Sequence, residues 1–151
     1  MREEMEIMAE LGCTRIASPA EGIKVTPDLF RVGERYRALL DLGRQTGGRP
    51  QLEIWGASVF FHIGQDMMAV AVANDPDARI LPDVYHLFRG NSGFESLKML
   101  DGNMIEVFHF NDYPNTIPRE EMGDKDRIYP GDGVAPLRQI VPDLKAMGRE
   151  K

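Results

Sequence analysis

Three short motifs in the sequence each place a carboxylate or an imidazole at the end of an apolar run. They are Leu52-Glu53-Ile54-Trp55-Gly56, Asp83-Val84-Tyr85-His86 and Phe108-His109-Phe110-Asn111-Asp112. The motifs are roughly 25 to 30 residues apart, which is about the length of one βα unit. Parallel strands present their carboxyl ends on the same side of a sheet or barrel. The spacing therefore predicts that the polar side chains meet in one mouth, where two carboxylates and a histidine can hold a divalent ion.

Strand and helix patterns alternate along the chain. The strands are expected over Cys13–Ser18, Gln51–Trp55, Arg79–Asp83 and Met104–Phe110. The helices are expected over Glu3–Leu11, Asp28–Gly43, Ser58–Asn74 and Ala135–Met147, with a shorter one near Phe94–Leu100. Thr26 is the expected N-cap of the second helix, because Pro27 suits the first helical turn. This alternation predicts an α/β fold with a parallel sheet.

Four motifs together resemble the sugar phosphate isomerase/epimerase family, whose members have the xylose-isomerase-like TIM barrel. The matching segments are 52–56, 80–86, 107–112 and Asp126-Arg127-Ile128-Tyr129-Pro130-Gly131-Asp132-Gly133. A complete TIM barrel takes about 250 residues, whereas this sequence has 151. The resemblance therefore implies a single domain over residues 1–151. We expect a partial TIM (β/α)8 barrel holding roughly the fourth to seventh βα repeats, without the first three strands and the eighth.

The three strand-end groups can be interpreted in two ways. From the residues alone, Glu53 is a carboxylate that must be paired, ligated or solvated. Asp83 is equally typical of a surface loop, and His109 of a packed core histidine. The resemblance implies instead that Glu53, Asp83 and His109 bind a divalent metal, with Glu53 also acting as the catalytic base. The expected ion is Mn²⁺, Mg²⁺ or Co²⁺ rather than Zn²⁺.

Four further residues receive roles from the same resemblance. His86, Arg127 and Trp55 are expected to contact the substrate, Arg127 through the paired donors of its guanidinium. An ion pair of Arg127 with Asp124 or Asp126 is the alternative that the sequence alone allows. Asp112 is expected to hold either the metal-binding histidine or the following loop in place. That loop, residues 113–125, is expected to form a lid over the site.

The resemblance implies an isomerase or epimerase that acts on a sugar or sugar phosphate. A divalent ion would polarise the carbonyl while a carboxylate moves the neighbouring proton through an enediolate. In the family a second glutamate lies on the eighth strand, so this chain is expected to hold an incomplete site. Two alternatives stay open. One is a non-catalytic half-barrel fragment or interaction module, and the other is a phosphoesterase of the apurinic-endonuclease type, which needs a histidine where Ile128 stands.

Composition narrows the expected partners and location. The formal net charge is -6 and the sequence has no run of Lys and Arg, which argues against nucleic acid as a partner. No apolar run approaches the roughly 20 residues that span a bilayer. Cys13 is the single cysteine, so an internal disulfide is excluded and a cytoplasmic location is expected. A partial barrel exposes two sheet edges, which predicts self-association or a complementary barrel chain.

Overall fold

The structure is a computed structural model that describes residues 1–21, 25–58 and 62–148. Three strands form a parallel sheet in the order β1-β2-β3: β1 (Arg15–Pro19), β2 (Arg49–Glu53) and β3 (Ile80–Leu81). The α-helices are α1 (Arg2–Glu10), α2 (Leu29–Thr46), α3 (Ile63–Ala73), α4 (Val84–Arg89) and α5 (Leu137–Ala146). Three 3₁₀ helices follow α4 along the chain: η1 (Phe94–Met99), η2 (Gly102–Met104) and η3 (Asp124–Asp126). The expected α/β fold with a parallel sheet is confirmed.

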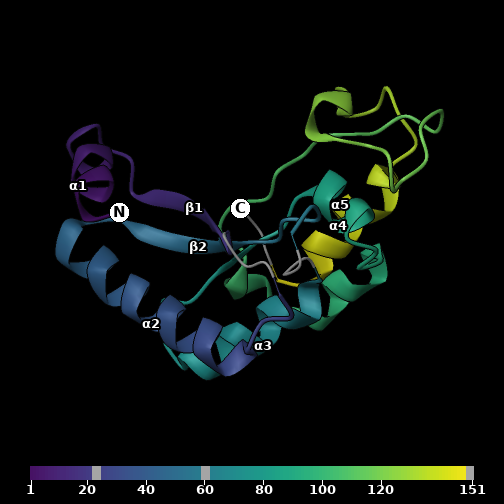
Figure 1. Cartoon of the computed structure of the whole chain (residues 1–151). Coiled ribbons are helices and arrows are strands. Elements are labelled where there is room, and N and C mark those ends of the chain that lie inside the picture. Colours follow the sequence, from purple (N-terminus) through teal and green to yellow (C-terminus); the bar gives the residue numbers. More distant parts are fainter. Residues whose placement is uncertain (22–24, 59–61, 149–151) are drawn as a thin grey trace.

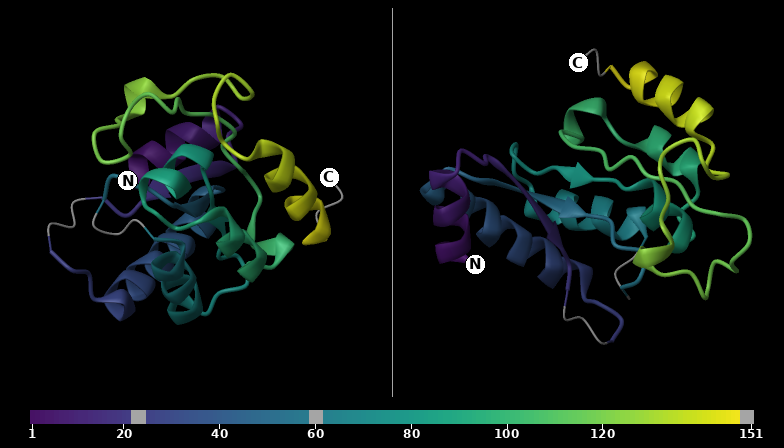
Figure 2. Two further views of the ribbon diagram at one scale, coloured as in Figure 1. Left: turned by 90° about the vertical axis from the view of Figure 1, so that its right-hand side faces the viewer. Right: turned by 90° about the horizontal axis from the view of Figure 1, so that it is seen from above.

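Helices α2 and α3 lie side by side and cover one face of the sheet (Figure 1). The strands run from the end occupied by α1 toward α4 and the long loop that follows residue 110, and Figure 2 shows the same arrangement from two other directions. In register, Pro19 is opposite Glu53 and Glu53 is opposite Leu81. This register places the Glu53 carboxylate at the carboxyl end of the sheet.

Two apolar clusters hold the helices against the sheet. Between α2, α3 and β2, the buried members are Tyr36, Leu40, Leu52, Ala69, Ala73 and Ala78. A larger cluster near the strand ends joins the segments before and after α4, and it includes Ile54, Ile80, Tyr85, Leu97 and Ile140. Side chains alternate between the two faces of a strand. Because Leu52 packs into the first cluster, its neighbour Glu53 faces the opposite side of the sheet, which would be the inside of a barrel.

The helix starts differ from the sequence expectation. Asp28 rather than Thr26 caps α2, because its Oδ1 accepts hydrogen bonds from the backbone N–H groups of Phe30 (3.1 Å) and Arg31 (3.3 Å). Helix α3 begins five residues later than expected. Its N-cap is His62, whose Nδ1 accepts from Gly64 N–H at 3.2 Å. The intervening residues 59–61 lie outside the described part of the chain.

The prediction of a regular fourth strand over Met104–Phe110 is wrong. Residues 102–104 form a 3₁₀ helix, and the segment after them pairs with the sheet at one isolated bridge between Asp83 and His109. His109 N–H donates to the Pro82 carbonyl at 2.9 Å, and Val84 N–H donates to the His109 carbonyl at 3.1 Å. This segment therefore lies beside the end of β3, where the fourth strand was expected, with one point of pairing.

Helix α4 is a further difference, since no helix was expected directly after the strand placed over Arg79–Asp83. Instead Asp83 caps the helix, with its Oδ1 accepting from His86 N–H at 2.9 Å. Val84, Tyr85 and Leu87 are all buried on this helix. The short helix forms because its apolar side chains pack into the large cluster while the carboxylate satisfies a free N–H group of its first turn.

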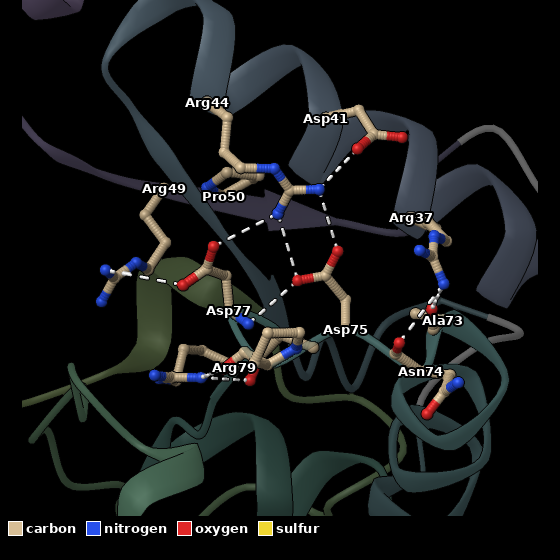
Figure 3. A network of polar contacts seen from close by, with 12 residues as sticks. Arg37, Asp41, Arg44, Arg49, Pro50, Ala73, Asn74, Asp75, Asp77 and Arg79 are labelled. Carbon is tan, nitrogen blue, oxygen red and sulfur yellow. Dashed lines mark hydrogen bonds and ion pairs between the residues drawn. The ribbon is translucent and has the colours of Figure 1, made fainter.

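A polar network fastens α2 to the segment between α3 and β3 (Figure 3). The guanidinium of Arg44 contacts the carboxylates of Asp41, Asp75 and Asp77. Arg37 donates to the carbonyls of Ala73 (3.1 Å) and Asn74 (3.3 Å), where a cation suits the C-terminal end of α3. The network lies at the opposite end of the strands from Glu53, so its role is structural.

Candidate functional site

Glu53, Asp83 and His109 come together at the carboxyl end of the sheet, as the sequence predicted. His109 Nδ1 lies 3.3 Å from Glu53 Oε1 and 3.7 Å from Asp83 Oδ2. The three side chains come from β2, from the end of β3 and from the bridged segment beside it. The contact with the Glu53 carboxylate raises the pKa of His109, and it outweighs the opposing effect of partial burial.

The Asp83 side chain is 0% exposed, and each of its oxygens has a separate set of contacts. Oδ1 accepts from His86 N–H, as described above. Oδ2 accepts from Asn111 Nδ2 at 2.7 Å and faces His109. The Asn111 side chain makes a second bond, because its Oδ1 accepts from Tyr85 N–H at 2.8 Å. A fully buried carboxylate is therefore held in one orientation by one backbone and one side-chain hydrogen bond.

His86 lies on α4 directly behind Asp83. The residue is 3% exposed, and its Nδ1 makes no hydrogen bond within the described residues. Burial lowers the pKa of His86, against the opposing influence of Asp83, Asp124 and Glu53. A neutral imidazole beside two carboxylates can accept or donate a hydrogen bond to a neutral ligand. The expected substrate contact of His86 stays a prediction.

Arg127 reaches the site from the loop after η3. Its NH1 lies 3.8 Å from Asp83 Oδ2, and its guanidinium carbon stands 5.7 Å from the centroid of the Tyr85 ring. The same side chain contacts Asp124, with Nε donating to the backbone carbonyl at 3.1 Å and NH2 3.8 Å from the carboxylate. The ion pair with Asp124, which was the alternative for Arg127, is therefore present, and the expected substrate contact of Arg127 stays a prediction. Trp55 is half-buried on the segment after β2, and its substrate contact stays a prediction.

Asp112 organises the loop that carries Gly131 and Gly133. Its Oδ1 accepts from the N–H groups of Tyr113 and Ala135, both at 2.8 Å, and its Oδ2 accepts from Gly131 N–H at 3.0 Å. Burial opposes ionisation of Asp112, but these backbone donors prevail and hold its pKa below the ordinary value. Of the two roles expected for Asp112, its contacts are those of a residue that holds the loop.

Gly56, the last residue of the first motif, allows α4 to approach β2 closely. A Cβ atom on Gly56 would lie 2.5 Å from the carbonyl oxygen of His86 and 2.7 Å from Gly90 N. Any larger residue would therefore push the helix away from the sheet. This contact sets the distance between the strand that carries Glu53 and the helix that carries His86.

The loop over residues 113–125 is fastened to α4 at several points. The Met122 carbonyl accepts from Tyr85 Oη at 3.0 Å and from Arg89 Nε at 3.1 Å. Arg89 NH2 also donates to the Glu120 carbonyl at 3.1 Å. At the beginning of the loop, the Tyr113 ring stacks on Phe88 with centroids 3.9 Å apart. These contacts are those of a docked segment, so a lid function for the loop stays a prediction.

The donor set suits a divalent metal ion, although the side chains are not closed around one point. Among the residues that the structure describes, no group of three or more His, Cys, Asp or Glu side chains is arranged so that it could hold a metal ion. However, neighbouring ligands of an octahedral ion stand about 3 Å apart, close to the 3.3 and 3.7 Å around His109 Nδ1. Carboxylates suit Mn²⁺ and Mg²⁺, and an imidazole together with carboxylates suits Zn²⁺. The residue types at the site therefore match the ligands of a divalent ion, although the structure does not arrange them around one.

Two residues of the site were missed in the sequence. Asn111 stands between His109 and Asp112 in the third motif, and a polar side chain two residues beyond a strand-end histidine is the signal that was available. Tyr85 supports both Arg127 and the docked loop, but nothing in its sequence position distinguishes it from a core tyrosine.

The fold and the strand-end site define a protein of the TIM-barrel class, in which functional side chains gather at the carboxyl ends of parallel strands. A family model described as "Xylose isomerase-like TIM barrel" matches residues 1–150. The chain belongs to this family.

Two curated proteins that the chain resembles are called inosose isomerase. The protein is 32% identical over 126 residues to the inosose isomerase of Bacillus subtilis (strain 168), which covers 83% of this chain and 42% of the relative. The inosose isomerase of Bacillus licheniformis is 26% identical over 129 residues, or 85% of this chain and 43% of that protein. The chain therefore spans less than half the length of these relatives.

Solved structures share the fold. A crystal structure of the IOLI protein with a binding zinc atom has a TM-score of 0.85 and 25% identity, covering 97% of this chain and 55% of that one. The D-allulose 3-epimerase from Methylomonas sp., solved in complex with D-allulose, has a TM-score of 0.72 at 15% identity and covers 97% of this chain and 50% of that one. The second likeness shows the fold alone. Among the described helices, none is both long and apolar enough to cross a membrane.

Proposed function

We propose that this chain carries part of a metal-dependent sugar isomerase or epimerase site, namely the residues at the carboxyl ends of the strands. The observation that carries the proposal is the approach of His109 Nδ1 to both Glu53 and Asp83 at the carboxyl end of a parallel sheet. The names of the curated relatives support the same reaction class, because both relatives are called inosose isomerase. The proposed substrate is a small sugar or sugar phosphate.

The residues divide the work by their positions. Glu53, Asp83 and His109 would hold a divalent ion, which when bound polarises a substrate carbonyl and acidifies the neighbouring C–H bond. Glu53 is the proposed base for that proton, since its carboxylate lies at the open end of β2. His86 and Arg127 would orient the substrate from α4 and from the loop, and Trp55 would line the mouth. The proposed ion is Mn²⁺, Mg²⁺ or Co²⁺, and the zinc in the IOLI structure makes Zn²⁺ a fourth candidate.

The test is a calorimetric titration of the metal-stripped chain with Mn²⁺ near neutral pH. We expect saturable binding of about one ion per chain, and loss of most of that binding in Asp83→Asn, since a charged ligand is replaced by an amide. Asp132→Asn is the matched control, because Asp132 is an exposed aspartate in the loop beyond Arg127. A chain that binds no Mn²⁺, or binds it equally well in Asp83→Asn, would overturn the proposed metal site.

The open edge of the sheet supports the proposed association with further barrel strands. Within the described residues β1 pairs with β2 alone, so its other edge presents free backbone groups. Beside it lies an apolar groove whose lining includes Ile16, Pro19, Val32, Leu39 and Leu52. We propose that a second copy or a complementary barrel chain covers this edge. Sedimentation velocity showing a compact monomer at all concentrations would contradict this.

One observation favours a non-catalytic role as the second candidate. Among the described residues, no group of three or more His, Cys, Asp or Glu side chains is arranged so that it could hold a metal ion. A half-barrel acting as an interaction module would bind a partner but turn over no sugar. Mn²⁺ binding without any epimerisation of D-allulose or inosose would favour this second role. The phosphoesterase alternative gains no support, because Ile128 pairs with Asp112 through two backbone hydrogen bonds of 3.0 Å and supplies no metal ligand.

A further inference from the structure

The side-chain amide of Asn111 joins the two sides of the proposed site. Its Nδ2 donates to Asp83 Oδ2 at 2.7 Å, and its Oδ1 accepts from Tyr85 N–H at 2.8 Å. The two bonds need opposite hydrogen-bonding groups on one planar side chain. Asparagine has both, whereas a carboxylate has acceptors only and would face the Asp83 carboxylate without a proton between them. The chemistry of the pair therefore explains why an amide stands at this position.

The first turn of α4 is docked entirely on site residues. Its free N–H groups at Val84, Tyr85 and His86 donate in turn to the His109 carbonyl, to Asn111 Oδ1 and to Asp83 Oδ1. A helix of six residues has too few internal bonds to fix its own position. The orientation of Asp83 and the position of His86 are consequently set together.

We infer that Asn111 is a positioning residue, one that turns the Asp83 carboxylate so that Oδ2 faces His109 while Oδ1 caps the helix carrying His86. The part of this inference that concerns metal binding rests on the proposed function. With Asn111 removed, the buried Asp83 carboxylate loses the amide donor that bonds Oδ2 and can rotate. The expected consequence is weaker binding of metal at the proposed site and a loosened bond from His86 N–H, because both depend on the orientation of the Asp83 carboxylate.

The test compares Asn111→Ala with Tyr85→Phe in the metal-free chain by amide hydrogen exchange. In Asn111→Ala we expect the His86 amide to exchange about tenfold faster or more, while Leu87, whose N–H bonds to the Asp83 backbone carbonyl at 2.9 Å, changes little. Tyr85→Phe is the matched control, because it removes the bond to the Met122 carbonyl from the same helix and leaves Asp83 alone. Equal acceleration at His86 and Leu87 would mean that the helix merely frays, and would overturn the inference.

Mn²⁺ titration supplies the second readout. We expect the Mn²⁺ dissociation constant to rise about 10–100-fold in Asn111→Ala, the usual effect of losing a residue that orients a ligand, and to stay unchanged in Tyr85→Phe. If the parent chain binds no Mn²⁺, the proposed function fails, but the exchange comparison still decides the role of Asn111. Should Asn111→Ala not fold cooperatively, Asn111→Asp replaces it, since this variant keeps an acceptor for Tyr85 N–H and loses the donor to Asp83. An unchanged His86 amide in either variant would overturn the inference.

Discussion

A Cβ atom placed on Gly133 would lie 2.3 Å from Oδ1 of Asp112. Gly133 and Asp112 thus pack so closely that no larger residue fits at position 133. The same Asp112 oxygen accepts two backbone hydrogen bonds, so the carboxylate cannot move aside without losing them. The second glycine of the Pro130–Gly133 turn is therefore required by close packing.

Replacing Gly133 by alanine should destabilise the chain. The added methyl group displaces Asp112 from its donors, and we expect the free energy of unfolding to fall by about 1–3 kcal/mol, as for other overpacked sites. Urea denaturation followed by circular dichroism measures the change. Gly123→Ala is the control, because a Cβ there meets its nearest atom at an ordinary 3.7 Å. Equal unfolding midpoints for the two variants would contradict this account.

Tyr36→Phe should also destabilise the chain, through the sheet rather than the site. The buried Tyr36 hydroxyl lies 2.8 Å from the Arg79 carbonyl and 3.1 Å from the Pro50 carbonyl, and accepts from Arg79 N–H at 2.9 Å. Its removal takes this partner from backbone groups of β2 and of Arg79, the residue before β3, which should lower the free energy of unfolding by about 1–3 kcal/mol. Tyr129→Phe, at a tyrosine that is 82% exposed, should leave the unfolding curve unchanged.

The convergence of Glu53, Asp83 and His109 could be predicted from spacing because parallel strands deliver their ends to one side. The local structure around them could not. Arg79–Asp83 and Met104–Phe110 have apolar patterns typical of strands, yet β3 ends at Leu81, and within the described residues the later segment pairs with the sheet at His109 alone. The chain leaves the sheet at this point because the Asp83 carboxylate caps a helix instead.

Helix α4 and Asn111 were beyond sequence reasoning for the same reason. A helix of six residues shows less than two turns of periodicity, and its stability comes from tertiary contacts rather than from propensity. The role of Asn111 depends on Tyr85 and Asp83, which are 26 and 28 residues away. Long-range hydrogen bonds of this kind leave no periodic signal in a single sequence.

Glu53→Gln should lower the pKa of His109 toward its ordinary value. The Glu53 carboxylate raises the pKa of His109 in the folded chain. The interaction therefore stabilises the fold below the ordinary histidine pKa of about 6.5, and this stabilisation disappears as the pH rises through the raised value. Titration of the His109 ring by NMR measures the shift. Glu95→Gln, at a glutamate paired with Lys98, is the control and should leave His109 unchanged, whereas an unmoved His109 in Glu53→Gln would contradict the contact.

Asp66 should make the stability of the chain depend on pH in the direction opposite to most carboxylates. Its side chain on α3 is 0% exposed, both oxygens make no hydrogen bond within the described residues, and burial raises its pKa well above the ordinary value. The folded state therefore holds its proton more tightly than the unfolded state, whose aspartate pKa is about 3.9. As the pH rises from the unfolded-state pKa to the raised folded-state pKa, ionisation of Asp66 progressively lowers the free energy of unfolding. Above the raised pKa this loss of stability is complete.

Asp66→Asn removes the ionisable group and keeps its shape. At the top of this pH range we expect the free energy of unfolding of the variant to exceed that of the parent chain by about 1–3 kcal/mol, the scale of an unsatisfied buried polar group. Near pH 4 we expect the two free energies of unfolding to differ little. Urea unfolding midpoints measured at several pH values provide the comparison, with Asp132→Asn as the exposed control. Parallel pH curves for Asp66→Asn and the parent would show that the carboxyl is solvated or paired in solution, because only a group whose pKa differs between the folded and unfolded chains can change their slope.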